Sequence, residues 1–290
     1  MRIVLHGQQA FGQAVLEKLL ERGENVVAVC CAPTKEGKPD DVLAVYAREQ
    51  GLPVYQPASW KTPEALALME SFESDVCMMA YVLLFVPEAV RDAPKYGTFQ
   101  YHPSLCPLHR GPSSINWPIA MGKDHTGLSI FWPDDGLDEG PIMLQKTCPI
   151  GPDETLGDVY FKRLFPMGVD AMLEGLDLVK SGVIIKHDQR LNDGTYEGWF
   201  GENEAEIDWS ATAEKVYNII RAANPAPGAW TTLAGKIIKI YDCARVDGSG
   251  KPGEVVGVND EGIIVQADGG RIVIKRVKAA GAKVSAVDWA

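Results

Sequence analysis

The first 31 residues alternate between short apolar runs and one amphipathic stretch, and this alternation restricts the possible folds more than any other feature of the chain. Residues 2–5 and 26–31 are almost entirely apolar, as in buried strands, and residues 8–22 repeat apolar side chains at helical spacing until Gly23. Further strands are predicted at residues 52–55, 75–81 and 98–102. Strands that alternate with helices form mostly parallel sheets. We therefore expect an α/β domain with a Rossmann-like, mostly parallel sheet.

Dinucleotide-binding domains also begin with a strand, a helix and a strand, so the glycines after the first strand decide whether a nicotinamide cofactor is expected. Gly7 and Gly12 are separated by four residues, whereas a pyrophosphate site needs closely spaced glycines that let the backbone approach it. The second strand ends at Cys30 and Cys31 without an acid that could hold a ribose. We therefore expect no NAD, and the pattern disfavours a nicotinamide-dependent dehydrogenase.

His102 stands at the end of a short predicted strand, residues 98–102, where Pro103 stops the strand. Open α/β sheets bind ligands at the carboxyl ends of their strands, so this histidine is a candidate for chemistry. A second predicted strand, residues 127–132, leads into a loop that is rich in acids and glycines and contains Asp138. A carboxylate from this loop could orient the imidazole and stabilise its protonated form. The alternative is a histidine in an ordinary turn beside a solvated acidic loop.

The residues around His102 and Asp138 also carry a resemblance to a known family. The sequence Gln-Tyr-His-Pro-Ser-Leu-Cys-Pro-Leu-His-Arg-Gly fills positions 100–111, and Gly-Leu-Asp-Glu-Gly fills positions 136–140. Both motifs resemble those of the formyltransferases that use 10-formyltetrahydrofolate. The likeness is closest to the hydrolase domain of 10-formyltetrahydrofolate dehydrogenases and extends to methionyl-tRNA formyltransferases. Further matching motifs, which spread the likeness over nearly the whole chain, include residues 195–198, 207–209 and 227–230.

The resemblance implies the formyltransferase fold and three catalytic residues. The catalytic histidine and aspartate of the family fall on His102 and Asp138, and its asparagine position falls on Gln100. Gln100 keeps the amide donor on a longer side chain, and Leu108 stands where many relatives have arginine. In this arrangement His102 moves protons and Asp138 orients it. The Gln100 amide stabilises the oxyanion that forms when the formyl carbonyl is attacked.

The resemblance also implies a folate pocket at the carboxyl end of the sheet. The apolar loop after the strand at residues 75–81 could form a wall against a flat pterin ring, because ligand pockets are apolar and concave. Alternatively, this loop packs under the helix that follows it. Tyr196 is expected either to cover the site or to be an exposed aromatic residue of a linker. The expected folate-binding residues are Leu83, Leu84, Phe85, Tyr101, Asp134, Asp135, Gly136, Leu137 and Tyr196.

The expected substrate and formyl donor is therefore 10-formyltetrahydrofolate. Likeness to the hydrolase domain favours water as the acceptor, and the products are then tetrahydrofolate and formate. The polar Gln100 keeps open a transferase that passes the formyl group to an amine, such as an aminoacyl-tRNA, an amino sugar or another small amine. A third possibility, from another class of function, is a non-catalytic protein that stores or senses the folate.

The chain changes character after a stretch that has no periodic apolar residues. Residues 186–203 contain the turn-forming sequence Asn-Asp-Gly and are expected to link a catalytic domain, residues 1–185, to a C-terminal domain, residues 204–290. One helix is predicted at residues 211–222, and short strands with glycine turns follow it at even spacing. This pattern is typical of a small barrel. In the family that the chain resembles, this domain is an OB-like barrel.

Composition limits the expected partners and location. The net charge is −11, and an acidic chain is a poor general binder of nucleic acid. A local basic cluster near the C-terminus, which lysines that protect a strand edge would also explain, comprises Arg271, Lys275, Arg276, Lys278 and Lys283. The six cysteines form no CxxC pair, so we expect no metal and a reducing, cytoplasmic environment. No apolar run approaches the roughly 20 residues that span a bilayer, so we expect no membrane association.

Overall fold

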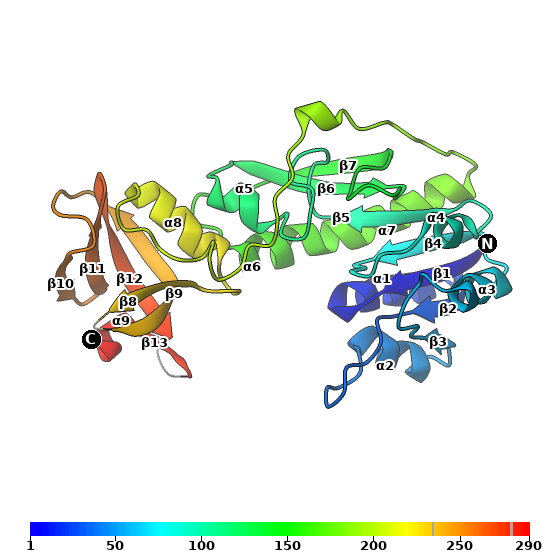
Figure 1. Cartoon of the computed structure of the whole chain (residues 1–290), viewed down its shortest axis with the longest axis horizontal. Coiled ribbons are helices and arrows are strands. Elements are labelled where there is room, and N and C mark those ends of the chain that lie inside the picture. Colours follow the sequence, from blue (N-terminus) through cyan, green and yellow to red (C-terminus); the bar gives the residue numbers. More distant parts are fainter. Residues whose placement is uncertain (234, 279–280) are drawn as a thin grey trace. The chain divides into compact units, whose positions relative to one another are not determined.

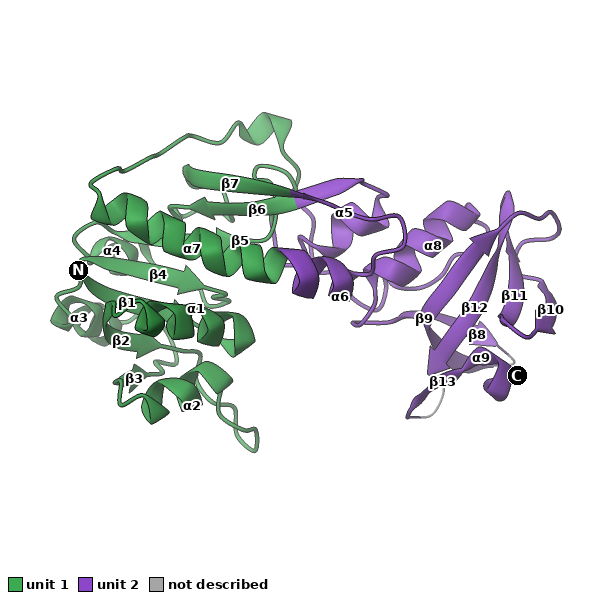
Figure 2. Cartoon of the chain, turned by 180° about the vertical axis from the view of Figure 1, so that it is seen from behind, with its two compact units in different colours: residues 1–110, 127–147, 164–195 green, residues 111–126, 148–163, 196–290 purple. Residues whose placement is uncertain are grey.

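The computed structural model describes residues 1–233, 235–278 and 281–290, and the chain divides into two compact units (Figure 1, Figure 2). Unit 1 comprises residues 1–110, 127–147 and 164–195. Unit 2 comprises residues 111–126, 148–163 and 196–290. Each unit is organised around its own sheet.

Unit 1 is built on a seven-stranded sheet in the order β3-β2-β1-β4-β5-β6-β7. Its strands are β1 (Arg2–Gly7), β2 (Asn25–Cys30), β3 (Val54–Tyr55), β4 (Val76–Ala80), β5 (Thr98–His102), β6 (His125–Phe131) and β7 (Ile142–Pro149). The first five strands are parallel to one another, and β6 is antiparallel to β5. The Rossmann-like, mostly parallel sheet expected from the sequence is confirmed, and the strand predicted at residues 98–102 is β5.

Helices cover both faces of this sheet, because successive side chains of a strand point to opposite sides. Ile3 and Leu5 of β1 point into the larger core, and Val4 points into a smaller core that contains Trp60. The larger core is closed by α1 (Gln9–Glu21), α2 (Val42–Glu49) and α7 (Phe165–Lys180). The smaller core is closed by α3 (Pro63–Ser71) and α4 (Glu88–Asp92). The carboxyl ends of the parallel strands are left for the loops that carry the expected site.

The segment predicted as a linker, residues 186–203, is attached to unit 1 over its first half. His187 and Ile142 exchange two backbone hydrogen bonds, of 2.8 and 3.0 Å, so the segment pairs with the start of β7. A short 3-10 helix, η2 (Leu191–Asp193), follows. The backbone N–H of Thr195 then donates to the carbonyl of Pro107 at 3.0 Å. These bonds keep residues 187–195 beside the loop that follows β5.

Unit 2 contains an antiparallel sheet in the order β10-β11-β12-β9-β8, with β13 paired to β12. Its strands are β8 (Ala229–Leu233), β9 (Lys236–Val246), β10 (Val255–Asn259), β11 (Gly262–Ala267), β12 (Gly270–Lys278) and β13 (Lys283–Ser285). Its helical segments are α5 (Asn116–Ala120), α6 (Leu156–Val159), the π-helical turn η1 (Tyr160–Leu164), α8 (Ala213–Ala222) and α9 (Ala286–Trp289). The predicted C-terminal β domain is confirmed as an antiparallel sheet of the kind found in small barrels, and the helix predicted at residues 211–222 is α8.

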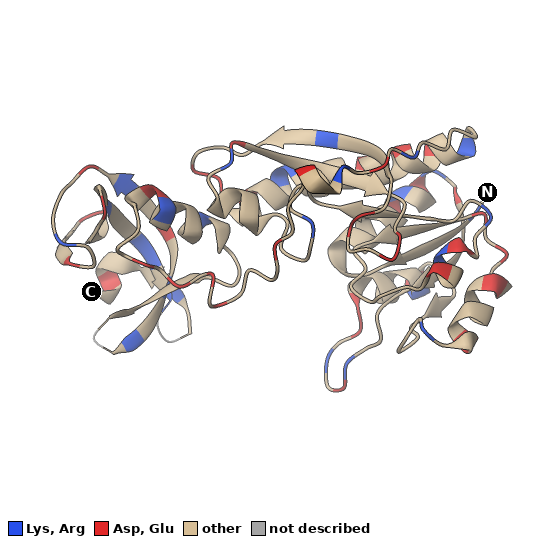
Figure 3. Ribbon diagram, turned by 45° about the horizontal axis from the view of Figure 1, so that its top comes forward, with Lys and Arg blue, Asp and Glu red and all other residues tan. Residues whose placement is uncertain are grey.

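The basic cluster predicted near the C-terminus lies on β12 and β13 (Figure 3). Lys278 is paired across the strands with Lys239 on one side and Lys283 on the other. The Nζ atom of Lys283 lies 3.6 Å from the centroid of the Tyr241 ring, and Lys239 Nζ lies 3.3 Å from a carboxylate oxygen of Glu202. Lys283 of the cluster is thus in contact with an aromatic ring, and the neighbouring Lys239 is paired with an acid. Within the described residues, no helix is long and apolar enough to cross a membrane.

Candidate active site

The structure brings His102 and Asp138 together from distant parts of the sequence. His102 is the last residue of β5, and Asp138 lies in the loop between β6 and β7. The His102 Nδ1 and Asp138 Oδ2 atoms are 3.6 Å apart, and the two side chains are only 8% and 10% exposed. At this distance the carboxylate attracts a protonated ring, although it is slightly too far for a direct hydrogen bond. The pair therefore places a carboxylate beside the ring, where it can stabilise a protonated His102.

The other nitrogen of the His102 ring shows which atom carries a proton. His102 Nε2 lies 3.2 Å from the carbonyl oxygen of His109, and because a carbonyl only accepts hydrogen bonds, Nε2 is the donor. Nδ1 is thus the nitrogen that faces Asp138. A further proton on Nδ1 makes the ring an imidazolium, which the Asp138 carboxylate stabilises.

Both residues that contact the His102 ring have an unusual backbone conformation. Asp138 has a φ of 56° and His109 has a φ of 53°, in the left-handed region that favours glycine. Such conformations cost on the order of 1–3 kcal/mol and persist where the surrounding structure holds them. The two backbone positions that orient His102 are therefore imposed by their neighbours rather than preferred by the residues themselves.

Residues 100–102 of β5 show how the strand distributes its side chains. Gln100 and His102 leave the same face of the sheet because they are two residues apart, and Gln100 is half-buried. Tyr101 leaves the opposite face, where its ring stacks on Phe11 with 4.3 Å between the centroids. Tyr101 is buried in the larger core, and its hydroxyl lies 3.4 Å from the carbonyl of Leu164. The structure therefore gives Tyr101 a packing role.

The apolar loop after β4 divides between packing and exposure. Leu84 and Val86 pack against the smaller core, as expected if the loop lies under the following helix. Leu83 and Phe85 point outward instead and are 56% and 52% exposed. Leu137, in the loop that carries Asp138, is 52% exposed. Exposed apolar side chains on the two loops at this end of the sheet are candidates for contact with a flat apolar ligand.

Arg91 of α4 connects the apolar loop to the acidic loop, and sequence reasoning missed it. Its buried guanidinium donates from Nη1 to the carbonyl of Val86 at 2.6 Å and from Nη2 to Asp135 Oδ1 at 2.9 Å. The Arg91 carbonyl in turn accepts a hydrogen bond from Thr98 Oγ1, at the start of β5, at 2.6 Å. In the sequence, Arg91 is one cation in a short helix, and nothing there indicates that its partners lie on two loops.

The acidic loop is shaped by its own side chains. Asp134 Oδ1 accepts a hydrogen bond from the N–H of Gly136 at 2.9 Å, which makes a tight turn. A Cβ atom on Gly136 would lie 2.5 Å from a carboxylate oxygen of Glu139, and one on Gly140 would lie 1.9 Å from the carbonyl oxygen of Trp132. Glycine is therefore required at position 140, where backbone lies against it, whereas at position 136 the Glu139 side chain would have to move.

Cys106 lies in the same stretch as His102 but is not suited to act as a nucleophile. It is buried, and its backbone N–H donates to Ser129 Oγ at 3.1 Å. Burial raises the pKa of the Cys106 thiol to about 11, so the thiol stays protonated at neutral pH. Among the described residues, no group of three or more His, Cys, Asp or Glu side chains is arranged to hold a metal ion.

Tyr196 belongs to unit 2 and is 55% exposed. Its ring lies against Gly111, where an added Cβ would come within 2.9 Å of Tyr196 Cε2. Gly111 has a φ of 104°, so a larger residue there would be strained as well as crowded. Its expected role as a cover for the site stays a prediction.

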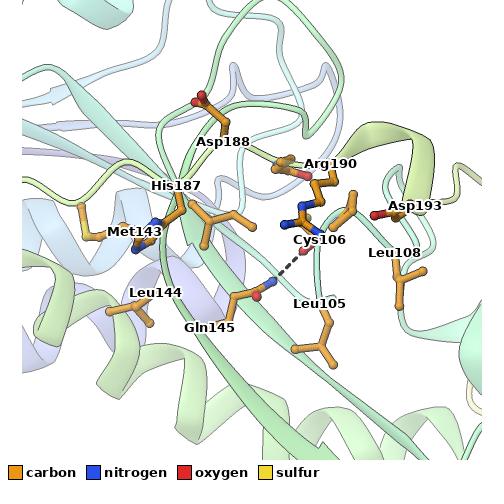
Figure 4. A pocket seen from close by; sticks show the side chains of 13 residues that line it. Leu105, Cys106, Leu108, Met143, Leu144, Gln145, His187, Asp188, Arg190 and Asp193 are labelled. Atoms are coloured by element: carbon orange, nitrogen blue, oxygen red, sulfur yellow. Dashed lines mark hydrogen bonds between the residues drawn. The ribbon is translucent and has the colours of Figure 1, made fainter.

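A cavity of about 570 Å³ lies beside the loop that follows His102 (Figure 4). It is bounded by the 105–108 segment, the first half of β7 and the 187–193 segment. The Gln145 side chain donates to the carbonyl of Cys106 at 2.8 Å and so ties one wall to the next. The lining side chains include Leu105, Leu108, Leu144, His187 and Arg190. The segment predicted as a linker therefore forms one wall of a cavity next to the loop that follows His102.

Comparison with known proteins adds to this geometry. Residues 1–174 match the family model described as formyl transferase, and residues 201–290 match that of the formyl transferase C-terminal domain. The mitochondrial 10-formyltetrahydrofolate dehydrogenase of Homo sapiens is 36% identical over 274 residues, which are 92% of this chain and 30% of that protein. The methionyl-tRNA formyltransferase of Geotalea uraniireducens (strain Rf4) is 34% identical over 288 residues, which are 98% of this chain and 92% of that protein.

A solved structure shares the fold. The crystal structure of HypX from Aquifex aeolicus in complex with tetrahydrofolic acid has a TM-score of 0.70 and 21% identity, and the match covers 100% of this chain and 46% of that chain. The chain spans about a third of the length of the dehydrogenase relative.

The sheet makes this an α/β enzyme, and its candidate site is the buried histidine–carboxylate pair at the end of β5. More specifically, the chain belongs to the formyl transferase family, with matches to both of the domains that the family models describe.

Proposed function

We propose that this enzyme removes the formyl group of 10-formyltetrahydrofolate by hydrolysis and releases tetrahydrofolate and formate. The observation that carries the proposal is the buried pair of His102 and Asp138 at the carboxyl end of β5. The similarity to 10-formyltetrahydrofolate dehydrogenase supports the choice of substrate, and the fold shared with a tetrahydrofolate complex is compatible with it.

The proposed reaction needs a proton acceptor, an orienting group and a donor for the oxyanion. Water adds to the formyl carbon while His102 takes one of its protons, and the carbonyl oxygen becomes an oxyanion. The Gln100 amide stabilises this charge. When the carbon–nitrogen bond breaks, the imidazolium returns the proton to the departing nitrogen, and the formyl carbon leaves as formic acid, which ionises to formate. Asp138 stabilises the imidazolium between the two transfers.

The proposed folate contacts come from the loop that follows β4 and from the loop between β6 and β7. The outward side chains of Leu83, Phe85 and Leu137 provide apolar surface for the pterin ring. Leu84 supports the first loop from below, and Asp134, Asp135 and Gly136 shape the second loop. We leave Tyr101 out of this set, because its ring is buried on the opposite face of the sheet.

A transferase is the second candidate, and a specific observation favours it. A methionyl-tRNA formyltransferase is 34% identical over 98% of this chain, which is nearly the identity that the dehydrogenase shows. In this case an amine replaces water as the attacking group, and His102 takes the proton from the amine nitrogen. The acceptor is then an aminoacyl-tRNA, an amino sugar or another small amine. The acidic net charge of −11 argues against a general nucleic-acid binder.

The test is to incubate the purified chain with 10-formyltetrahydrofolate, with and without candidate amines, and to follow tetrahydrofolate and formate. Stoichiometric formate without added amine supports hydrolysis. Tetrahydrofolate that appears only with an amine, together with a formylated product, overturns hydrolysis in favour of transfer. Tight folate binding without either product overturns both and supports storage.

Two coarser proposals accompany this function. We propose a formyltransferase domain at residues 1–185, a linking segment at 186–203 and a C-terminal domain at 204–290, which the two family-model matches support. We also propose a cytoplasmic location, because all six cysteines are free thiols and five of them are buried.

A further inference from the structure

The position of Asp138 depends on a backbone conformation that aspartate does not prefer. Its φ of 56° lies in the left-handed region, and the flanking loop contains Gly136 and Gly140, which allow many alternative conformations. Contacts from outside the loop therefore add to the loop's own hydrogen bonds in holding the conformation that brings the carboxylate to His102.

Gln189 makes the contacts that can do this. Its Nε2 donates one hydrogen bond to the carbonyl of Asp138 at 2.9 Å and another to the carbonyl of Gly140 at 2.7 Å. A side-chain amide has two N–H donors, so both are used on the loop that carries Asp138. The two carbonyls lie on either side of Glu139, and one side chain thus fixes the chain direction through the Asp138–Gly140 turn.

The oxygen atom of the Gln189 amide shows why the side chain keeps this orientation. Gln189 Oε1 is buried and has no hydrogen-bond partner among the described residues. Turning the amide over would place this oxygen against two carbonyl oxygens, which is repulsive. The amide therefore keeps the orientation that serves the two loop carbonyls even though its own oxygen is left unsatisfied.

Gln189 is itself held by the sheet of unit 1. The backbone of His187, two residues earlier, is paired with Ile142 at the start of β7. The indole Nε1 of Trp132 donates to the carbonyl of Ile185 at 2.8 Å, just before this pair. Bonds to the end of β6 and to the start of β7 thus place the segment, and Gln189 transmits that placement to Asp138.

We propose that Gln189 is a positioning residue that holds Asp138 against His102. This inference rests on the proposed function, in which the pair moves the protons of formyl removal. The inference adds Gln189, from the segment predicted as a linker, to the residues of the proposed site. Without the two donors, the Asp138–Gly140 turn can relax toward ordinary backbone conformations and carry the carboxylate away from the ring.

The test compares three variants in the full chain. Gln189→Leu removes the donors at similar volume. Gln189→Glu restores one donor only when the carboxyl group is protonated. Gln266→Leu is the matched control, because Gln266 Nε2 also donates to two carbonyls of one turn, those of Ala267 and Gly270, both at 2.8 Å, in unit 2.

For Gln189→Leu we expect kcat to fall about 10- to 100-fold with little change in KM, because a displacement of about 1 Å is enough for such a loss. For Gln189→Glu the ratio of its kcat to the wild-type kcat should rise as the pH is lowered from about 8 to about 5. The Gln266→Leu control should lose stability without losing kcat. Unchanged kcat in Gln189→Leu, or an equal loss of kcat in Gln266→Leu, overturns the inference.

A crystal structure of Gln189→Leu separates this inference from the proposed function, because it does not depend on activity. We expect a changed φ at Asp138 and a longer distance between Asp138 Oδ2 and His102 Nδ1. Unchanged geometry at Asp138 overturns the positioning role even if the wild-type enzyme proves to act on another substrate. If Gln189→Leu does not fold, the pH-dependent ratio for Gln189→Glu decides in its place, and a flat ratio overturns the inference.

Discussion

The carbonyl oxygen of His109 accepts a hydrogen bond from His102 Nε2 at 3.2 Å, so the backbone of one histidine determines which ring nitrogen of the other faces Asp138. His109 adopts a left-handed backbone conformation at this point. The loop after β5 therefore folds back toward the end of β5, and its backbone orients the side chain of His102.

The role of His102 can be tested against another histidine of the same chain. We expect His102→Ala to lower kcat for formyl removal by about 10²- to 10⁴-fold, the usual contribution of a general acid–base group, while folate binding is kept. Asp138→Ala should do the same. The control is His125→Ala, since His125 is exposed and pairs with Asp124 on the surface. Tetrahydrofolate release measures kcat, and a separate titration measures folate binding. A wild-type rate in His102→Ala would contradict the assignment of His102 as the acid–base group.

Gln100 provides a second test, of oxyanion stabilisation. Gln100→Leu removes the amide donor, and the loss of one such donor typically lowers kcat about 10²- to 10³-fold. Gln100→Asn keeps a donor on a shorter side chain and should retain more activity than the leucine variant. The two variants are compared by kcat at saturating folate. Equal kcat in Gln100→Leu and the wild type would remove Gln100 from the mechanism.

Arg91 provides a test of loop geometry. We expect Arg91→Leu to raise KM for the folate and to lower the free energy of unfolding by about 2 kcal/mol, because charged hydrogen bonds to a buried carbonyl are lost. Arg22→Leu is the control, because Arg22 forms a surface ion pair with Asp177, whose side chain is 52% exposed, and this pairing should contribute less than about 1 kcal/mol. Urea denaturation and folate titration measure both effects. Equal losses in the two variants would contradict a central role for Arg91.

The buried thiols predict how stability changes in alkaline solution. Burial raises the pKa of Cys77 to about 12 and that of Cys106 to about 11. In the unfolded chain these thiols ionise near pH 8.5. Their contribution to the free energy of unfolding is therefore complete below that pH and is lost as the pH rises toward the pKa values of the folded chain. We expect the free energy of unfolding to fall by about 1.4 kcal/mol per pH unit for each such thiol above about pH 9.

Urea denaturation at a series of pH values measures this slope. Cys77→Ala should reduce the slope whatever it does to stability at neutral pH, because one titrating group is removed. An unchanged slope in this variant would show that Cys77 titrates alike in the folded and unfolded chains.

The sequence predicted most of unit 1, because its buried strands are apolar runs that end at clear turns. β5 was predicted at its observed ends, since Pro103 stops the strand. His102 was singled out from its place at a strand end, and the acidic loop was expected to supply a carboxylate, but the choice of Asp138 among the acids of that loop came from the family resemblance. Local patterns could not have supplied it, because the approach of the two residues depends on the path of an irregular loop.

Other parts of the site were beyond sequence reasoning for identifiable reasons. Gln189 lies in a stretch without periodicity, and its donors reach a loop about 50 residues earlier. Arg91 looks like a surface residue until its two partners are seen. The position of Tyr101, by contrast, could have been predicted from the sequence. Successive side chains of a strand point to opposite faces, so Tyr101 lies opposite Gln100 and His102.

The pairing of His187 with Ile142 has a practical consequence for protein engineering. A chimera that joins this chain to a foreign C-terminal domain at residue 186 would replace a piece of backbone that pairs with the edge of the sheet and that bonds, through Gln189, to the loop that carries Asp138. A junction placed after Thr195 keeps that piece, and the grafted enzyme should retain its turnover there.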